Sequence, residues 1–176
     1  MEIRKLFKFE SSHIVRGCST RRCSRNNHGH SGKLEVFFTA DELDNGGMII
    51  DFGLLKDPIG TFIDRFDHAW HYWVNEDPEI IKAIHNINER WIQLPFTPSA
   101  ENYSFYFLLA INDLLKKMEF KNGERNVKCC RVRYHETDTG YAEATLEDLK
   151  RFKPYFKLED VVFSEGILNE NIVATK

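Results

Sequence analysis

The chain opens with regular alternation of apolar and polar residues. Across residues 3–13 one face would carry Phe7, Phe9, Ser11 and His13, and the other Lys8, Glu10 and Ser12. A period of two over this length predicts a half-buried β-strand. The alternation returns from His28 to Phe38, which predicts a second strand that pairs with the first. Between them, residues 14–27 are polar, basic and aperiodic, as is typical of a loop.

The next region changes from strand to helix periodicity. Residues 47–52 form a short apolar run after the turn sequence DNGG, which predicts a short strand. Asp51 then stands where it would cap a helix. The apolar stripe of that helix recurs at helical spacing and comprises Leu55, Ile59, Phe62, Ile63 and Phe66. Pro58 and Gly60 within this stretch predict a kink or a late helix start.

Two further helices carry clear start signals. Asp77 followed by Pro78 is the pattern of an N-cap and a first helical residue, so we predict a helix in DPEIIKAIHNI. A long helix is predicted to begin near Ser99 and to end before Gly123, because apolar residues recur along it every three or four positions.

Two more strands are predicted after the long helix. Alternation resumes across residues 126–136, and a turn at TDTG leads into a strand near residues 141–144. After about residue 151 the apolar residues follow no clear period. The order of strands and helices favours an α+β fold, with an antiparallel sheet and helices on one side.

The length of 176 residues favours a single domain. We assign residues 1–150 to this domain and residues 151–176 to a C-terminal extension of it. An apolar content of 42% with 29% charged residues is typical of a globular protein and excludes a disordered chain.

The charge balance limits the classes of binding partner that we expect. The net charge of −3 arises from 27 acidic and 24 basic residues, so no strong field attracts nucleic acid or an anionic membrane, and we expect neither partner. We see no signal peptide, and no segment approaches the roughly 18 apolar residues of a membrane span, so we expect a cytoplasmic protein. Its four cysteines should then remain reduced thiols.

His28 and His30 are candidate functional residues, as a pair of metal ligands. Residues two apart in a strand project from the same face, so both imidazoles would point to one place. His13 ends the preceding strand and can join them. Three neutral imidazoles with an open position are typical of a catalytic zinc site. The alternative is two ordinary polar residues at the start of a strand.

A second metal hypothesis uses cysteines. Cys18, Cys23, His28 and His30 would make a closed structural Cys2His2 zinc site. The neighbouring Arg21, Arg22 and Arg25 would then favour a nucleic-acid-binding zinc knuckle. The spacing differs from the usual finger and leaves His13 without a role, so we rank this hypothesis second.

The sequence resembles the 6-pyruvoyltetrahydropterin synthase family, and within it the bacterial 6-carboxytetrahydropterin synthases of queuosine biosynthesis, a tRNA modification pathway. The matched segments occur in family order and are FESSH (9–13), Cys23 before HGHS (28–31), GMIIDFGLLK (47–56), FDH (66–68), PSAEN (98–102) and HETDTG (135–140). Together they cover about residues 3–145.

The resemblance implies a fold and a metal. The fold is the T-fold, an antiparallel β-sheet with two long helices packed on one face, which assembles into an oligomeric barrel. A homo-oligomer is implied, with a hexamer favoured, and its active sites lie between subunits. The resemblance also implies that His13, His28 and His30 bind Zn²⁺, which coordinates the hydroxylated side chain of a dihydropterin.

The same resemblance implies the catalytic residues. Cys23 matches the cysteine base that removes a proton from the substrate side chain, with Cys18 as the alternative if the loop register differs. Asp67 and His68 match a carboxylate that orients an imidazole for proton transfer. Because adjacent side chains rarely hydrogen-bond within a helix, we expect this pair just beyond a helix or acting across an interface. His71 is expected to be structural.

The resemblance also implies which residues recognise the pterin, and these lie at the end of a predicted strand. Glu136 matches the carboxylate that anchors the pterin by accepting two N–H bonds, with possible help from Thr137. Ser99 is expected to cap the long helix, and we expect Glu101 and Asn102 to be structural only.

Two reactions follow from the resemblance, both starting from 7,8-dihydroneopterin triphosphate. We favour the carbon–carbon lyase that yields 6-carboxytetrahydropterin, acetaldehyde and triphosphate. The alternative is triphosphate elimination to 6-pyruvoyltetrahydropterin. Arg21, Arg22 and Arg25 would either hold the triphosphate or be solvated charges. The sequence departs from the family pattern in four places: four residues separate Cys23 from HGH, AWHYWVN follows Asp67 and His68, about twenty extra residues precede PSAEN, and the tail has no counterpart in short members.

Overall fold

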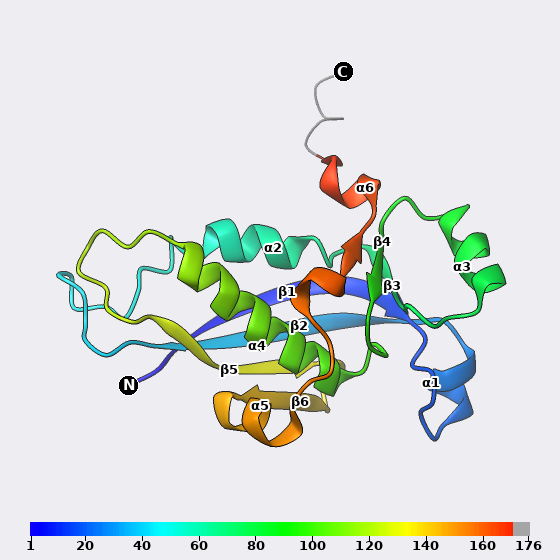
Figure 1. Cartoon of the computed structure of the whole chain (residues 1–176), viewed down its shortest axis with the longest axis horizontal. Helices are drawn as coiled ribbons and strands as arrows, with labels where there is room; N and C mark the ends of the chain where they lie inside the picture. Colours follow the sequence, from blue (N-terminus) through cyan, green and yellow to red (C-terminus); the bar gives the residue numbers. More distant parts are fainter. Residues whose placement is uncertain (171–176) are drawn as a thin grey trace.

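A computed structural model describes residues 1–170 of the chain as a mixed α/β structure (Figure 1). Its strands are β1 (Ile3–His13), β2 (His28–Thr39), β3 (Ala69–Trp73), β4 (Trp91–Leu94), β5 (Lys128–His135), β6 (Tyr141–Thr145) and β7 (Val162–Phe163). They form one sheet in the order β6-β5-β2-β1-β3-β4-β7. The α-helices are α1 (Arg21–Arg25), α2 (Thr61–Asp64), α3 (Pro78–His85), α4 (Ala100–Lys117), α5 (Leu146–Phe152) and α6 (Glu165–Leu168).

The first two strands confirm the alternation seen in the sequence. β1 and β2 pair antiparallel along their whole length, with His13 opposite His28 and Ser11 opposite His30. Phe9 is buried on the same face as His13, whereas the intervening Glu10 is exposed. The connection between the strands, predicted as a loop, also contains the short helix α1.

Two of the six strand pairings depart from the antiparallel prediction. The β1–β2, β2–β5, β5–β6 and β4–β7 pairings are antiparallel, but β3 runs parallel to both β1 and β4. The sequence analysis identified neither β3 nor β4. The first four residues of β3 are all buried, so its two faces show no apolar–polar contrast. A strand covered on both faces has no alternation to detect.

The region before α2 also differs from the prediction. Residues 47–52 form turns instead of the predicted strand, although Ile49 and Ile50 are buried. Asp51 accepts a hydrogen bond from the Gly53 N–H and caps a turn. A π-type turn at Lys56–Gly60, with Asp57 in an extended conformation, precedes α2. This second helical segment is therefore interrupted, while the predicted apolar stripe still faces the core.

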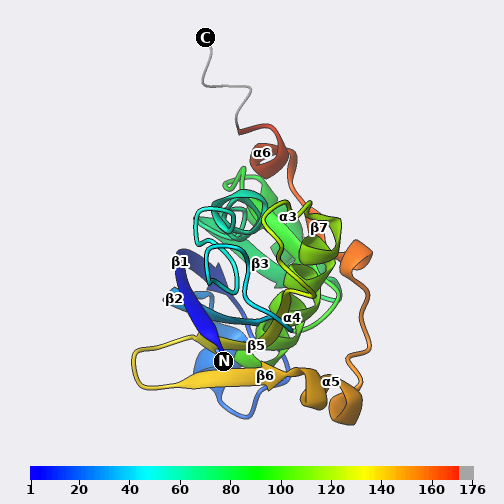
Figure 2. The same ribbon diagram turned by 90° about the vertical axis from the view of Figure 1, so that its left-hand side faces the viewer.

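The remaining helices begin where the capping residues predict. The Ser99 side chain accepts from the Asn102 N–H at the start of α4, and Asp77 accepts from the Glu79 N–H at the start of α3. α4 packs across β5 and β6 on one face of the sheet (Figure 1 and Figure 2). Its buried aromatic residues include Tyr103 and Phe107, which contact Phe9 and Tyr134 of the sheet.

The other face of the sheet is much less covered. Leu6 of β1 is 38% exposed, Tyr141 of β6 is 55% exposed, and Ser31 of β2 is exposed. The segment after α5 returns along the side of the molecule and adds β7 to the edge beyond β4. Residues 171–176 of the predicted extension lie outside the described part. No described helix is both long enough and apolar enough to cross a membrane.

Candidate active site

Three histidines converge where β1 ends and β2 begins. Strand register places His13 directly opposite His28 and puts His30 two pairs further along, all on the face that α4 covers. Ring centroids are 4.7 Å apart for His13 and His28, 5.1 Å for His13 and His30, and 5.0 Å for His28 and His30. One ring nitrogen from each residue lies within 4.8 Å of the other two. We call these three residues the histidine triad.

The triad has the properties of a metal-binding site. Within residues 1–170, Nε2 of His13 and Nε2 of His30 are buried without a hydrogen-bond partner. Nδ1 of His28 lies 3.0 Å from the carbonyl oxygen of Asn26, a contact that leaves its Nε2 free for a ligand bond. Buried nitrogens without partners are costly, and a cation would satisfy them. Imidazole donors suit zinc.

Two members of the triad, His13 and His30, are also in the protonation state that a metal requires. Burial, together with the neighbouring rings of His28 and His30, lowers the pKa of His13 to about 3. Burial lowers the pKa of His30 as well, against the opposing effect of the Glu136 carboxylate. Both rings are therefore neutral at pH 7, and a neutral imidazole binds metal ions without first losing a proton.

A cavity of about 290 Å³ lies beside the triad. Its lining includes Cys18, Cys23, His28, Glu101 and Glu136. It thus brings together a metal-binding imidazole, two thiols and two carboxylates from four separate parts of the chain. This combination can bind a polar ring and move protons on a substrate held against the triad.

Both candidate thiols face this cavity. Cys23 lies in the middle of α1 and is half-buried. The Cys18 thiol donates to the carbonyl oxygen of Thr20 at 3.3 Å, so it is already engaged. Neither sulfur joins the triad, and the triad is the one metal-binding cluster found among the described residues. The closed Cys2His2 hypothesis is therefore not supported.

The carboxylates differ from expectation in one respect. Glu136 follows β5, and its Oε1 lies 3.5 Å from Nε2 of His13 and 3.8 Å from Nε2 of His30. Glu101, which we expected to be only structural, lines the cavity from the first turn of α4. Its position two residues after the Ser99 cap was the available signal, because first-turn side chains can project beyond a helix end. Asn102 is structural, with its amide donating to the Thr97 carbonyl at 2.9 Å.

Two other expected contributors lie away from this cavity. Thr137 is exposed, and its hydroxyl lies 3.5 Å from that of Thr139. Arg21 and Arg22 are exposed on α1, and Arg25 lines a smaller neighbouring cavity with Arg16. None of these residues lines the cavity beside the triad.

Asp67 and His68 form a pair just beyond α2, in the place the sequence predicts. Nδ1 of His68 lies 2.7 Å from Oδ2 of Asp67, and Oδ1 of Asp67 accepts the Glu10 N–H at 2.6 Å. Burial opposes the effect, but the Glu10 N–H and the His68 ring hold the pKa of Asp67 below its usual range. The carboxylate is therefore ionised and can orient the imidazole.

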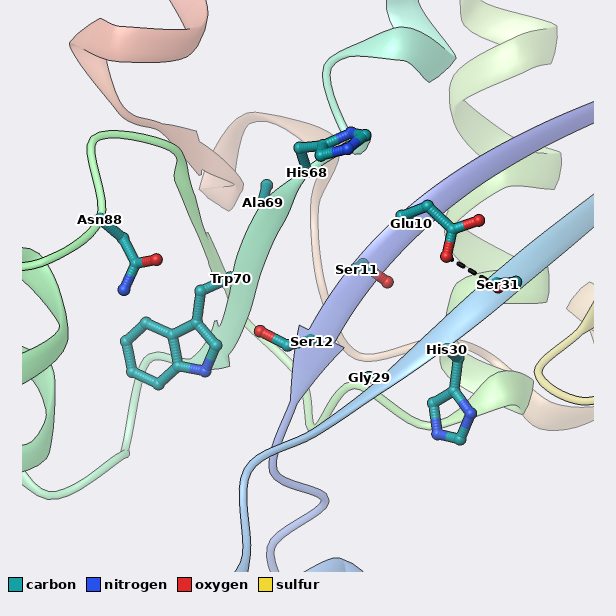
Figure 3. A pocket seen from close by; sticks show the side chains of 10 residues that line it. All are labelled: Glu10, Ser11, Ser12, Gly29, His30, Ser31, His68, Ala69, Trp70 and Asn88. Atoms are coloured by element: carbon teal, nitrogen blue, oxygen red, sulfur yellow. Dashed lines mark hydrogen bonds between the residues drawn. The ribbon is translucent and has the colours of Figure 1, made fainter.

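This pair faces a different cavity. His68 has a side chain 73% exposed and lines a hollow of about 390 Å³ with Glu10, Ser12 and Ser31 (Figure 3). In Figure 3 the ring of His30 points away from His68. The single chain therefore does not bring His68 and Cys23 to the same cavity.

His71 has the structural position expected for it. It is fully buried, with Nδ1 2.7 Å from the Tyr103 hydroxyl and Nε2 3.1 Å from the Phe66 carbonyl oxygen. Burial lowers its pKa to about 3. It links β3 to α4 and to the end of α2.

Comparison with known proteins identifies relatives over most of the chain. A protein of Helicobacter pylori named 6-carboxy-5,6,7,8-tetrahydropterin synthase is 46% identical over 95% of this chain and 84% of its own length. A protein of Aquifex aeolicus with the same name is 32% identical over 81% of this chain and 96% of its own length.

Solved structures share the fold at lower identity. A Wolinella succinogenes protein described as uncharacterised matches with a TM-score of 0.68 at 19% identity, over 83% of this chain and 98% of its own. The 6-pyruvoyl tetrahydropterin synthase of Plasmodium falciparum matches with a TM-score of 0.59 at 16% identity, over 82% and 96%. The fold is therefore the predicted T-fold.

The model of one protein family matches residues 2–147, which include the triad, both thiols, the Asp67–His68 pair and Glu136. The chain therefore belongs to the 6-pyruvoyl tetrahydropterin synthase family of enzymes.

Proposed function

We propose that the chain is a 6-carboxy-5,6,7,8-tetrahydropterin synthase. It would convert 7,8-dihydroneopterin triphosphate and water to 6-carboxytetrahydropterin, acetaldehyde and triphosphate, for queuosine biosynthesis. The relatives that match nearly the whole chain carry this name. The observation that carries the proposal is the convergent histidine triad beside a cavity with a thiol and carboxylates.

The triad would hold a zinc ion through His13, His28 and His30; the buried Nε2 atoms of His13 and His30, which lack hydrogen-bond partners, support this role. When bound, zinc supplies Lewis acidity that makes a substrate hydroxyl more acidic. The chain's own contribution is to fix three imidazoles by strand register and to keep those of His13 and His30 neutral.

The cavity residues act on the rest of the substrate. Cys23, as the thiolate, removes a proton from the three-carbon side chain. Glu136 accepts N–H bonds from the 2-amino group and N3 of the pterin, a bidentate match to a carboxylate. Glu101 supplies a second acceptor on the wall of the same cavity.

Asp67 and His68 act across an interface between two copies of the chain. His68 is exposed and does not line the cavity that contains Cys23, yet it is already oriented by an ionised carboxylate. In a homo-oligomer, with a hexamer favoured, His68 of one copy would enter the cavity of the next and exchange protons with the substrate.

The test is product analysis with 7,8-dihydroneopterin triphosphate. We expect acetaldehyde and triphosphate in equal amounts, and loss of both after treatment with a chelator. Triphosphate without acetaldehyde would instead assign the 6-pyruvoyl reaction, which the name of the matching family model favours.

A further inference from the structure

The segment that carries Cys23 is tied to the rest of the molecule at few points. Residues 14–27 leave β1 after His13 and return at His28. Their backbone bonds are internal: the Val15 N–H donates to the Cys23 carbonyl at 3.1 Å, and the Ser24 N–H donates to the Thr20 carbonyl at 3.0 Å. These bonds hold the segment together but do not orient it against the sheet.

One side-chain interaction, between Arg16 and Glu76, supplies that orientation. We call this pair the clamp. Nε of Arg16 donates to Oε1 and Oε2 of Glu76 at 3.0 and 2.8 Å, and Nη2 donates to Oε1 at 2.7 Å. Among the described residues, the only other side-chain hydrogen bond between this segment and the body of the protein joins the Asn26 carbonyl to Nδ1 of His28, where β2 begins. The paired guanidinium and carboxylate make a directional contact that a single point charge cannot reproduce.

Glu76 is a fixed anchor for this contact. Its side chain is only 3% exposed, and its Oε1 also accepts the Asp77 N–H at 2.8 Å. It lies between β3 and α3, in the stretch of extra residues that separates FDH from PSAEN. A buried carboxylate is costly unless it is paired, so Glu76 holds Arg16 firmly in place.

The other end of the same guanidinium reaches the residue after Cys23. Nη1 of Arg16 donates to the Ser24 carbonyl at 2.7 Å, while the neighbouring Val15 N–H holds the Cys23 carbonyl. Arg16 therefore connects the buried anchor directly to the turn of α1 that carries the thiol. Displacing Glu76 would release both contacts.

We propose that Arg16 and Glu76 are positioning residues that fix the Cys23 thiol against the cavity beside the triad. This inference rests on the proposed role of Cys23 as the base. It also gives a role to the extra residues after β3, because Glu76 among them holds the segment that carries Cys23. A misplacement of about 1 Å can lower turnover by about 10²-fold, so the position of the thiol governs kcat.

The test compares Glu76→Gln and Arg16→Lys with wild type and with a matched control, Asp113→Asn. The control breaks an exposed ion pair between Lys117 and Asp113 on α4. We expect both clamp variants to lower kcat by about 10- to 100-fold with KM changed less than about twofold. Bound zinc should remain equal to wild type, and the control should change nothing.

A second readout does not depend on turnover. Reaction of Cys23 with iodoacetamide, followed by peptide mass spectrometry, should be faster in both clamp variants because the segment is loosened. The buried Cys129 serves as the internal reference and should react at an unchanged rate. A role limited to fold stability would leave the ratio of the two rates unchanged in the folded protein.

Each possible result either supports or overturns the proposed role of Arg16 and Glu76. Unchanged kcat in both clamp variants of an active enzyme would overturn the inference, as would a fall in kcat matched by an equal loss of zinc. If Glu76→Gln does not fold, Arg16→Lys decides, because it keeps the charge at Glu76 paired. If wild type shows no turnover, the proposed function fails. The role of the clamp would be overturned separately if Cys23 reacted with iodoacetamide at the same rate in the clamp variants as in wild type.

Discussion

The histidine triad and the Asp67–His68 pair are two proton-handling clusters built in opposite ways. The triad lies on regular strand backbone, with His13 buried and His28 and His30 half-buried, and its imidazoles converge on one point. The pair lies on the short connection between α2 and β3 and exposes its imidazole. His68 also has a positive φ of 52°, which a residue with a side chain rarely adopts.

The difference between these clusters indicates which part of the active site one chain provides and which part comes from a neighbouring copy. Strand pairing alone assembles the triad, so a single chain provides the complete metal-binding set. The unusual backbone of His68 is held by Glu10, which accepts the His68 N–H at 2.7 Å and donates its own N–H to Asp67. A strained, exposed and oriented imidazole persists where the surrounding structure imposes it, often for function. We therefore expect one cluster to work within its own chain and the other to work on a neighbour.

The largest effect is expected from removing a member of the triad. His28→Ala should lose bound zinc and all turnover, because two imidazoles hold the ion too weakly. His68→Ala is the matched change in the other cluster and should keep stoichiometric zinc. Metal analysis of both purified variants measures this, and zinc retained in His28→Ala would contradict the assignment of the triad.

The cavity beside the triad should show the next largest effect. Cys23→Ala should keep zinc but lower kcat by about 10²- to 10⁴-fold, the usual contribution of a proton-transfer group. Cys18→Ala, which changes a thiol lining the same cavity, should retain turnover. Acetaldehyde release measures both, and the reverse result would make Cys18 the base.

Acid should destabilise the metal-free protein through buried histidines. In the folded state the pKa values of His13 and His71 lie at about 3, so between pH 7 and pH 5 only the unfolded chain takes up their protons. The free energy of unfolding should fall by about 2 kcal/mol for each of these groups. Urea unfolding with a chelator present measures the fall, and His13→Gln should remove about half of it. An equal fall in that variant would contradict the assignment.

Mixing two inactive variants tests the division of labour directly. Cys23→Ala and His68→Ala homo-oligomers, denatured and refolded together, should recover about a quarter of wild-type turnover, because a symmetric interface can combine one intact half from each copy. Mass spectrometry would verify that mixed oligomers form. If they form without recovered turnover, the pair acts within its own chain.

The smallest effect concerns the backbone of His68. His68→Gly should raise the free energy of unfolding by about 0.5–1 kcal/mol, since glycine adopts a positive φ without strain. Turnover should nevertheless be lost with the imidazole. Thermal unfolding compared with His68→Ala measures the effect, and equal stability of the two variants would show that no strain is stored there.

Local sequence patterns by themselves determined much of this molecule. The alternation in β1 and β2 predicted both strands, and the caps at Asp77 and Ser99 predicted where α3 and α4 begin. The triad was predictable for the same reason, since strand parity decides which side chains share a face. The positions of Cys23 and Glu136 came from a family resemblance, and the cavity that joins them depends on tertiary packing.

Tertiary structure decided what no local period encodes. β3 is buried on both faces and β4 is only four residues long, so only packing shows that they extend the sheet in parallel. Arg16 and Glu76 meet across 60 residues of sequence, and only the sheet order brings them together. Periods of two and 3.6 residues report which face of an element is buried. Which elements become neighbours, and which charges then pair, is set by the packing of the whole chain.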